Sequence, residues 1–293
     1  MRIGIVILPE LPWTEQADLW RRAERYGFDH AWTYDHLSWY GLADSPWGAT
    51  IPTLTAAATV TSTIRLGTFV ASPNYRHPVP FAKEVATVDE ISGGRLILGV
   101  GAGAGGSGLD ATVLGTPVLT PRERHERFVE FTRDLDRLLR FEEPGSDGIS
   151  FTGDWFTGDR ARMVGEPAQR PRVPLAVAAD GPRGIRFAAE IADAWITLGH
   201  HADSESEWWD GVSQLIARSQ DAEAAVGRER PLDRILSLDA GPGYSLASAA
   251  KFEDCVGRAA ELGFTDVVTH WPRPDGVYAG DERVLDEIAP AAH

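Results

Sequence analysis

Residues 64–105 constrain the fold more than any other part of the sequence. They read as a strand over 64–70, a turn rich in Pro and Asn, a helix over 78–92 that stops at two glycines, and a strand over 95–101. This order is typical of a βαβ unit, which needs parallel strands and a crossover helix. Both strands run into segments in which the backbone can approach a ligand closely, the second of them a run of Gly and Ala at 101–105.

The same alternation of strand and helix repeats along the whole chain. Strands are predicted at 2–8, 29–34, 64–70, 95–101, 174–179, 194–198, 234–239 and 265–271. Helices are predicted at 14–27, 52–62, 78–92, 121–140, from 182, 204–226, 246–262 and from 281. Eight such units without a break in composition fit a (β/α)8 TIM barrel, of the α/β class, better than an open sheet. The chain, 1–293, is therefore predicted to be a single domain, with a short β excursion inserted at 149–165.

Composition excludes several classes of function. The net charge of −15 argues against a nucleic-acid partner, because phosphate binding needs clustered Lys and Arg. No apolar run approaches the roughly 18 residues of a membrane span, and the first residues lack the pattern of a signal peptide. The single cysteine, Cys255, allows no internal disulfide and falls in a predicted helix, where a core position is expected. We therefore expect a cytoplasmic protein.

In a barrel of this kind, catalytic residues come from the carboxyl ends of the strands, because only those loops converge at the mouth. The residues at the predicted strand ends are Asp35, His36, Ser72, Asn74, Gly101, Gly103, Ala179, Asp180, Gly181, Gly199, His200, Asp239, His270 and Trp271.

Several segments carry a family resemblance. They are WTYDHL (32–37), LGTFVASPNYRHP (66–78), AKEVATVDEISGGRLILGVGAG (82–103), FTGDWF (151–156) and VPLAVAADGPRGIRFAAEIADAWI (173–196). Together they resemble the luciferase-like monooxygenase superfamily of FMN- and coenzyme F420-dependent oxidoreductases. The resemblance implies a (β/α)8 barrel with an inserted segment that holds a flavin or deazaflavin at its mouth. It also implies hydride transfer to or from a substrate, or oxygen activation on the reduced flavin.

Asp35 and His36 are the predicted catalytic residues. The resemblance places them where the F420-dependent branch has an Asp-His pair beside the deazaflavin ring. An imidazole titrates near neutral pH, so His36 can donate a proton or stabilise the charge that a hydride acceptor gains. The alternative is structural: Asp35 caps the following segment and His36 fills the strand end.

The resemblance also implies cofactor contacts around the third and fourth strands. Phe69-Val70 takes the place of a non-prolyl cis peptide behind the ring, and Ser72 takes that of a hydroxyl facing the ring or its ribityl chain. Gly101 and Gly103 would form a wall of the cofactor pocket. The alternatives are a turn opened by Ser-Pro-Asn and a flexible loop. Some F420-dependent sugar dehydrogenases carry a glutamate at about the position of Ala104, which argues against that chemistry here.

The segment after the fifth barrel strand is a candidate phosphate site. Gly followed by Pro at a helix start leaves amide donors facing outward, where the helix dipole favours a phosphate. Asp180 as an N-terminal cap would compete with this anion binding. Arg76 and His77 could hold an acidic tail instead. The predicted cofactor-binding residues here are Ala178, Ala179, Asp180, Gly181, Pro182 and Arg183, with Arg183 as a charge partner.

The predicted substrate pocket is aromatic. Trp39, Tyr40 and Trp47 lie in the loop after the second strand and suit a lid that stacks on a ring or an apolar substrate. A surface patch for oligomerisation is the alternative. His270 and Trp271, at the last strand end, would line the same pocket. The histidines lack the HxH and HExxH patterns, so we expect no metal site.

The first hypothesis is therefore an oxidoreductase that transfers a hydride between coenzyme F420 and a small organic substrate. An FMN-dependent monooxygenase and a non-catalytic flavin-binding protein are the alternatives. A Schiff-base enzyme is disfavoured because neither Lys83 nor Lys251 falls at a strand end. We expect a homodimer from the resemblance, and the sequence leaves the substrate open.

Overall fold

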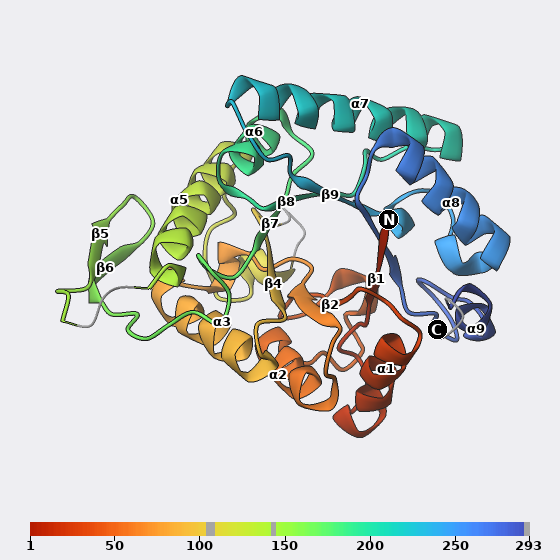
Figure 1. Cartoon of the computed structure of the whole chain (residues 1–293), viewed down its shortest axis with the longest axis horizontal. Helices are drawn as coiled ribbons and strands as arrows, with labels where there is room; N and C mark the ends of the chain where they lie inside the picture. Colours follow the sequence, from red (N-terminus) through yellow and green to blue (C-terminus); the bar gives the residue numbers. More distant parts are fainter. Residues whose placement is uncertain (104–108, 142–144, 290–293) are drawn as a thin grey trace.

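Eight parallel strands close into a barrel in the computed structural model, which describes residues 1–103, 109–141 and 145–289 apart from the side chains of Tyr40, Leu109 and Thr112. The order around the barrel is β1-β10-β9-β8-β7-β4-β3-β2 (Figure 1). The strands are β1 (Arg2–Val6), β2 (His30–Thr33), β3 (Arg65–Thr68), β4 (Leu96–Gly101), β7 (Leu175–Ala178), β8 (Ala194–Thr197), β9 (Asp233–Ser237) and β10 (Asp266–His270). The predicted (β/α)8 fold is confirmed.

Helices surround the barrel as an outer ring (Figure 1). They are α1 (Trp13–Arg25), α2 (Thr50–Val60), α3 (Pro78–Ser92), α5 (Pro121–Leu139), α6 (Pro182–Ile191), α7 (Glu205–Ala225), α8 (Ala249–Leu262) and α9 (Arg283–Ile288). All of them were predicted. The start of α8 is later than expected because 245–247 form a separate 3-10 turn, η4 (Ser245–Ala247), and the Ser248 hydroxyl then caps α8 by accepting the Lys251 N–H.

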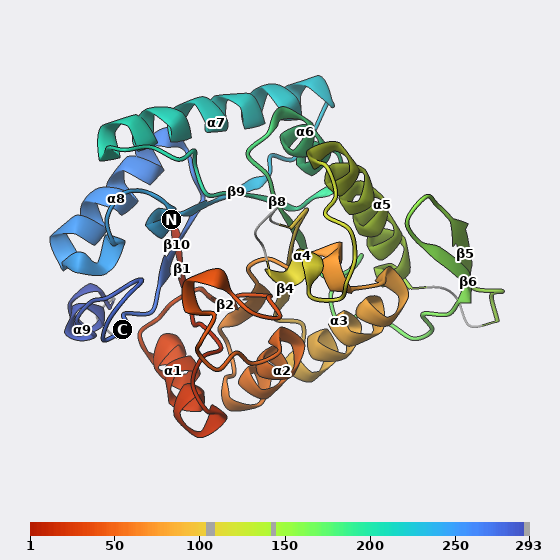
Figure 2. The same cartoon turned by 180° about the vertical axis from the view of Figure 1, so that it is seen from behind.

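Short helical turns in the loops at the carboxyl end of the barrel were not predicted. They are η1 (Tyr40–Leu42), η2 (Pro73–Tyr75), α4 (Leu109–Thr112) and η3 (Leu238–Ala240). Elements of three or four residues are too short to show a hydrophobic period. Figure 2 shows α4 in front of the barrel strands, on the side where β4 ends.

The predicted β excursion is a two-stranded antiparallel hairpin, β5 (Ile149–Thr152) and β6 (Thr157–Ala161), outside the helical ring (Figure 1). One side chain of α5 holds its turn: the Glu130 carboxylate accepts the backbone N–H groups of Asp154, Trp155 and Phe156 at 2.7–3.3 Å. The hairpin is therefore fixed to α5 by charge-assisted hydrogen bonds.

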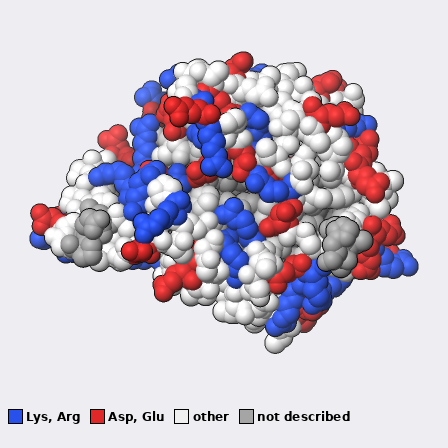
Figure 3. Space-filling view, in the orientation of Figure 1, with Lys and Arg blue, Asp and Glu red and all other residues white. Residues whose placement is uncertain are grey.

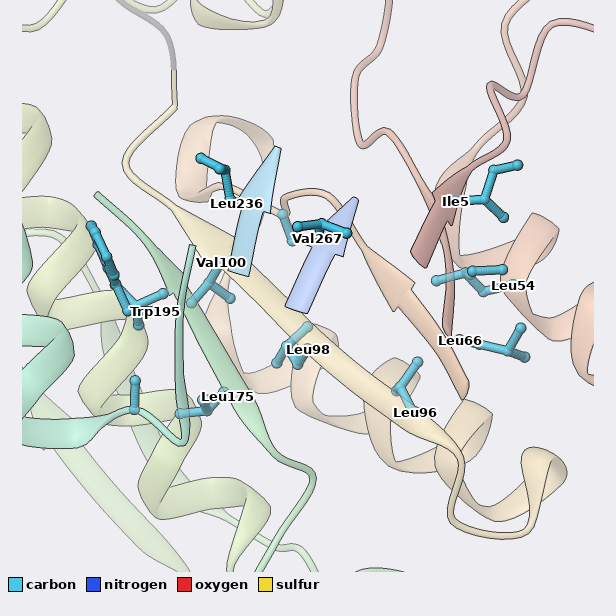
Figure 4. Close-up of a cluster of buried hydrophobic side chains, with 14 of the residues drawn as sticks. Ile5, Leu54, Leu66, Leu96, Leu98, Val100, Leu175, Trp195, Leu236 and Val267 are labelled. Carbon is cyan, nitrogen blue, oxygen red and sulfur yellow. The ribbon is translucent and has the colours of Figure 1, made fainter. Parts of the chain in front are cut away.

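Strand residues alternate between two cores. Side chains such as Ile5, Leu66 and Trp195 point outward and pack against the helices (Figure 4). Their neighbours Val6 and Ile196 point inward and fill the barrel. This alternation is the two-residue period of a strand. Each fully buried aliphatic side chain contributes on the order of 2 kcal/mol to stability.

Among the described residues, no helix combines the length and apolar character that a membrane crossing requires. Lys and Arg side chains lie beside Asp and Glu side chains in several places on the face shown in Figure 3. One such cluster closes the amino-terminal end of the barrel, where Asp266 accepts from both Arg2 nitrogens at 2.6–2.7 Å and contacts the His30 ring at 3.0 Å. Burial alone would raise the pKa of Asp266, but these partners lower it to about 2.

We predict that Asp266→Asn destabilises the fold near neutral pH by about 2 kcal/mol, which is the free energy that corresponds to a pKa lowered from 3.8 to about 2. Because the folded-state pKa is the lower one, this stability is present above about pH 4 and is lost as the pH falls toward 2. Urea unfolding of wild type and variant at several pH values measures the difference. It should shrink in acid, and the exposed control Asp18→Asn should show none.

Candidate functional site

Five aromatic side chains meet at the carboxyl end of the barrel. We call Tyr34, Trp39, Trp47, Phe69 and Tyr278 the aromatic cluster. Tyr34 lies 5.3 Å edge-on from Trp39 and 6.5 Å, nearly parallel, from Phe69. Trp39 stacks on Tyr278 at 6.3 Å and contacts Trp47 at 6.0 Å. The cluster packs on the inner barrel core, so it forms the floor and wall of the barrel mouth.

The cluster brings together Trp39 and Trp47, two of the residues predicted to contact substrate. Tyr40 begins η1 in the same loop, but its side chain lies outside the described residues. Ala104 and its neighbours in the loop after β4 also lie outside them. A substrate contact of Trp39 and Trp47 stays a prediction.

His36 is held by a carboxylate that sequence reasoning missed. Its Nδ1 lies 2.5 Å from Oδ2 of Asp110, which is buried, and the Leu37 N–H donates to the other Asp110 oxygen at 2.6 Å. Because a carboxylate accepts, the proton of the neutral His36 ring is on Nδ1, and Nε2 keeps a lone pair. The imidazole is 29% exposed and can exchange a proton. The only sequence signal for Asp110 was an acidic residue in a loop after a strand.

Asp35 does not join His36. Its buried carboxylate forms a two-pronged ion pair with Arg76, with one contact of 2.8 Å from Nη2 to Oδ1. The guanidinium lies 4.5 Å from the rings of both Tyr75 and Phe81. Burial alone would lower the pKa of Arg76, but the Asp35 carboxylate raises that pKa above the ordinary value of an arginine. Asp35 therefore ties the end of β2 to the loop after β3.

The other basic residue of that loop, His77, is also engaged. Its Nδ1 accepts the Val79 N–H at 3.2 Å as the cap of α3, and its Nε2 donates to the Thr157 carbonyl at 3.1 Å. Arg76 and His77 thus serve internal contacts, which disfavours the alternative that they hold an acidic tail.

The end of β3 matches one implication of the resemblance: the peptide bond between Phe69 and Val70 is cis. Ser72 is buried, and its hydroxyl accepts the Asn74 N–H at 3.4 Å to cap η2. The turn interpretation of Ser72 is therefore confirmed, and its contact with a cofactor stays a prediction.

Gly101 and Gly103 are required by packing. A Cβ on Gly101 would lie 2.8 Å from Val70 Cγ2. Gly103 has a φ of +77° and a Cβ there would lie 2.4 Å from Asn74 Nδ2. The missing side chains therefore allow the loop after β4 to lie against the loop after β3.

The start of α6 differs from the expectation for Asp180. The N-cap is Gly181, without a side-chain hydrogen bond, and Asp180 instead accepts from the Thr197 hydroxyl at the end of β8. Burial raises the Asp180 pKa above its ordinary value. A Cβ on Gly181 would meet nothing within 4 Å, and Arg183 in the first turn is exposed. Within the part of the chain that the structure describes, the N-cap therefore gives the amides of this turn no side-chain acceptor, and the space beside Gly181 is open.

The two residues just before this cap lie deeper. Ala178 ends β7 beside the inner core. The Ala179 carbonyl accepts the Trp195 indole N–H at 2.7 Å, and Pro182 is the first residue of α6.

His270 and Trp271 point to opposite sides of the last strand. His270 is buried at the mouth, whereas the Trp271 indole donates to Glu282 at 3.0 Å and lies 5.0 Å from the Arg22 guanidinium in the outer layer. The prediction that Trp271 lines the pocket is wrong, because consecutive strand residues face opposite ways.

His270 belongs to a chain of hydrogen bonds. Its Nδ1 lies 2.8 Å from Asp239, and its Nε2 lies 2.7 Å from the Tyr34 hydroxyl, which lies 3.0 Å from the Tyr278 hydroxyl. Asp239 and His270 were both predicted strand-end residues. Tyr34 and Tyr278 were missed, because tyrosines next to or beyond a strand end look like ordinary packing residues.

Two other reactive groups are buried or paired. Cys255 is buried in the core, and burial raises the pKa of its thiol to about 11. Lys251 pairs with Glu205 at 2.5 Å. Within the described ranges, no three or more His, Cys, Asp or Glu residues are grouped so that they could hold a metal ion.

The sequence profile of the luciferase-like monooxygenase family matches residues 1–240. The chain belongs to this family. Among curated relatives of this luciferase-like protein are an F420-dependent glucose-6-phosphate dehydrogenase of Nakamurella multipartita and an F420-dependent hydroxymycolic acid dehydrogenase of Mycobacterium tuberculosis. The first is 33% identical over 65% of this chain and 54% of the relative. The second is 35% identical over 71% of this chain and 53% of the relative. The luciferase-like chain therefore spans about half the length of these relatives.

Solved structures share the fold of this luciferase-like protein. An F420-dependent secondary alcohol dehydrogenase in complex with an F420-acetone adduct matches with a TM-score of 0.78 and 18% identity. A coenzyme F420-dependent tetrahydromethanopterin reductase from Methanopyrus kandleri matches with a TM-score of 0.74 and 20% identity. Each similarity covers 98% of this chain and 96% of the other.

We predict that Asp110→Asn moves the His36 proton from Nδ1 to Nε2 in the luciferase-like protein. The amide can still accept the Leu37 N–H with its oxygen, but it presents an NH2 group to His36. Asp110→Ala should lose both contacts, so the Leu37 amide should exchange with solvent at least about tenfold faster. Ring 15N shifts and hydrogen exchange measure the two effects. An unchanged His36 spectrum in Asp110→Asn would contradict this prediction. The control is Asp44→Asn, because Asp44 is exposed and lies in the loop after β2 that also carries His36.

Proposed function

We propose that the protein is an oxidoreductase that transfers a hydride between coenzyme F420 and a small organic substrate. The observation that carries this proposal is the His36–Asp110 pair at the barrel mouth, a proton-exchanging group held in one tautomer. The F420 dependence named for curated relatives of the chain supports the choice of cofactor.

The described residues fit such a cofactor in three ways. The aromatic cluster offers flat apolar surface for a ring system and excludes water from it. The start of α6 offers uncapped amides to a phosphate, and Asp180 does not compete as a cap. His36 can hold or give a proton at Nε2. A bound deazaflavin supplies the hydride acceptor or donor, and the protein supplies binding, orientation and proton handling.

Local charge offsets the acidity of the whole protein. A net charge of −15 repels a polyanionic cofactor at long range. Near α6, however, burial and, as the smaller cause, the positive charge of Arg183 lower the pKa of His125 on α5. Arg183 is therefore the positive charge that would favour a phosphate at the start of α6.

Titration with coenzyme F420, and separately with FMN, tests the cofactor. We expect F420 to bind and FMN to be ignored, as followed by absorbance and fluorescence. Preference for FMN would instead favour a monooxygenase that uses reduced flavin and oxygen. A 4-hydroxyprotoasukamycin monooxygenase of Streptomyces nodosus, 33% identical over 74% of this chain and 56% of the relative, supports that second candidate. Binding of neither would overturn the proposal, and binding without turnover would indicate a non-catalytic flavin-binding protein.

We predict that Asp180→Asn tightens F420 binding by about fivefold, because it removes a negative charge beside the proposed phosphate site. Burial raises the Asp180 pKa, so the wild-type carboxyl takes up a proton at a higher pH than an ordinary aspartate. Wild-type affinity should therefore rise as the pH falls through that range, and the variant should lose this dependence. Fluorescence titrations at several pH values measure both effects. Equal affinities would contradict the phosphate assignment, and exposed Asp203→Asn is the control.

The homodimer and the cytoplasmic location stay predictions. Light scattering of the purified protein measures the oligomeric state.

The residues of the proposed cofactor site are Ala178, Ala179, Asp180, Gly181, Pro182, Arg183, Phe69, Val70, Ser72, Gly101 and Gly103, with His36 and Asp110 as the proton-handling pair.

A further inference from the structure

A second group of proton-exchanging side chains lies at the barrel mouth, apart from His36 and Asp110. We call Asp239, His270, Tyr34 and Tyr278 the tyrosine relay. Its links are 2.8 Å from Asp239 Oδ2 to His270 Nδ1, 2.7 Å from His270 Nε2 to the Tyr34 hydroxyl, and 3.0 Å from there to the Tyr278 hydroxyl. The relay thus joins the ends of β2, β9 and β10 with the loop that follows β10.

The direction of its hydrogen bonds follows from Asp239. Oδ2 of Asp239 already accepts the backbone N–H of His270 at 2.7 Å, so the ring nitrogen facing the same oxygen donates as well. In the neutral ring, Nε2 then accepts from the Tyr34 O–H, which leaves the Tyr34 oxygen to accept from Tyr278. A proton arriving at Tyr278 can therefore pass inward to His270, where the Asp239 carboxylate stabilises the imidazolium.

The surroundings hold the inner end of the relay rigidly. The side chains of Asp239 and His270 are each only 1% exposed. The second Asp239 oxygen accepts the Ser245 N–H at 2.8 Å, and the Tyr244 hydroxyl donates to the His270 carbonyl at 2.6 Å. Fully partnered buried polar networks of this kind are rigid. A carboxylate, an imidazole and a hydroxyl in a row also form the arrangement that makes a hydroxyl a proton acceptor.

The outer end of the relay lies within the aromatic cluster. The Tyr278 ring stacks on His270 at 3.8 Å and on Trp39 at 6.3 Å, and it is half-buried. The Tyr34 ring centre lies 6.5 Å from that of Phe69 and 6.0 Å from that of His36, and the Tyr34 and His36 rings are nearly perpendicular to each other. Both hydroxyl groups are therefore placed beside the proposed substrate and cofactor residues.

We propose that the tyrosine relay exchanges the hydroxyl proton of an alcohol substrate, or returns it to the carbonyl product, which makes Tyr278, Tyr34 and His270 further catalytic residues of the proposed reaction. This inference rests on the proposed function. In the oxidative direction the substrate C–H bond breaks and its hydride, with both electrons, passes to the oxidised deazaflavin. The O–H bond breaks at the same carbon, its proton passes to Tyr278 and on to His270, and a carbonyl forms. Reduction of a carbonyl runs the same steps backwards.

The two proton-handling groups then have separate tasks. His36, held by Asp110, faces the change in charge on the hydride acceptor. The tyrosine relay faces the change in charge on the substrate oxygen. Tyr34 is the point of contact between them, because its ring lies against His36 and its hydroxyl belongs to the relay.

Binding of a fluorinated alcohol to the cofactor-free protein tests the relay without any turnover. The probe is 1,1,1-trifluoro-2-propanol, and methyl 2,2,2-trifluoroethyl ether is the matched probe without a hydroxyl proton. We expect 19F NMR to show that wild type binds the alcohol about tenfold more tightly than the ether, as one hydrogen bond allows. Alcohol binding should also shift the His270 Nε2 15N resonance.

Tyr278→Phe should abolish this preference for the alcohol. Tyr26→Phe is the matched control, because it also removes the hydrogen-bonded hydroxyl of a half-buried tyrosine but one that contacts Arg22 and Asp286 in the outer layer and not the relay, so the preference should persist. Equal binding of the two probes by wild type, binding of neither, or a preference that survives in Tyr278→Phe would each overturn the inference. If Tyr278→Phe failed to fold, the wild-type spectrum would decide: a His270 Nε2 resonance that alcohol binding leaves unshifted would overturn the inference.

Turnover with coenzyme F420 and the alcohol adds a second readout. Tyr34→Phe and Tyr278→Phe should lower kcat by at least about tenfold and change its pH profile, while Tyr26→Phe keeps the wild-type profile. The two proposals can fail separately. A Tyr278-dependent preference for the alcohol without F420 binding would remove the proposed cofactor alone, and F420 binding without that preference would remove the relay alone.

Discussion

The pairing of the first strand with the last closes the barrel, and the tyrosine relay depends on it. β1 pairs with β10 in parallel from Arg2 opposite Asp266 to Val6 opposite His270. Closure brings β2 and β10 to either side of β1, so Tyr34 and His270, 236 residues apart in sequence, share a hydrogen bond. An open sheet of the same strands would leave these residues at opposite edges. The Arg2–Asp266 ion pair secures the same junction at the other end.

Most of the fold could be predicted from the sequence because each element carries its own periodic pattern. The strands are short, buried and rich in β-branched residues, and glycines end α3 and α8 in the left-handed conformation. Side-chain partners carry no such pattern. Asp110 follows a loop with no period, and Tyr278 lies beyond the last strand, so only the closed barrel shows that they reach His36 and Tyr34.

The prediction that Asp180 caps α6 was wrong for a different reason. Its position before Gly-Pro is suitable for a helix cap, but the Thr197 hydroxyl on the neighbouring strand offers a competing partner that is 17 residues away in sequence. A helix-cap rule considers only residues close in sequence, so it does not include such a distant hydrogen-bond partner. The buried carboxylates of the mouth follow a common principle: Asp35, Asp110 and Asp239 each have a cationic or hydrogen-bonding partner within the barrel end. An acidic protein can therefore keep several carboxylates at one site because each is locally neutralised or hydrogen-bonded.

The β5–β6 hairpin is held by Glu130 on α5 and by His77 at the start of α3. Glu130 accepts three consecutive amides of the hairpin turn, and His77 donates to the Thr157 carbonyl of β6, whereas the side chains of the two strands are half-buried or exposed. These anchors and the exposed positions of the hairpin are thus separable. Changes at the exposed positions should leave the barrel undisturbed as long as Glu130 and His77 keep their contacts. The insertion is therefore a module in which new surface properties can arise at little cost to folding.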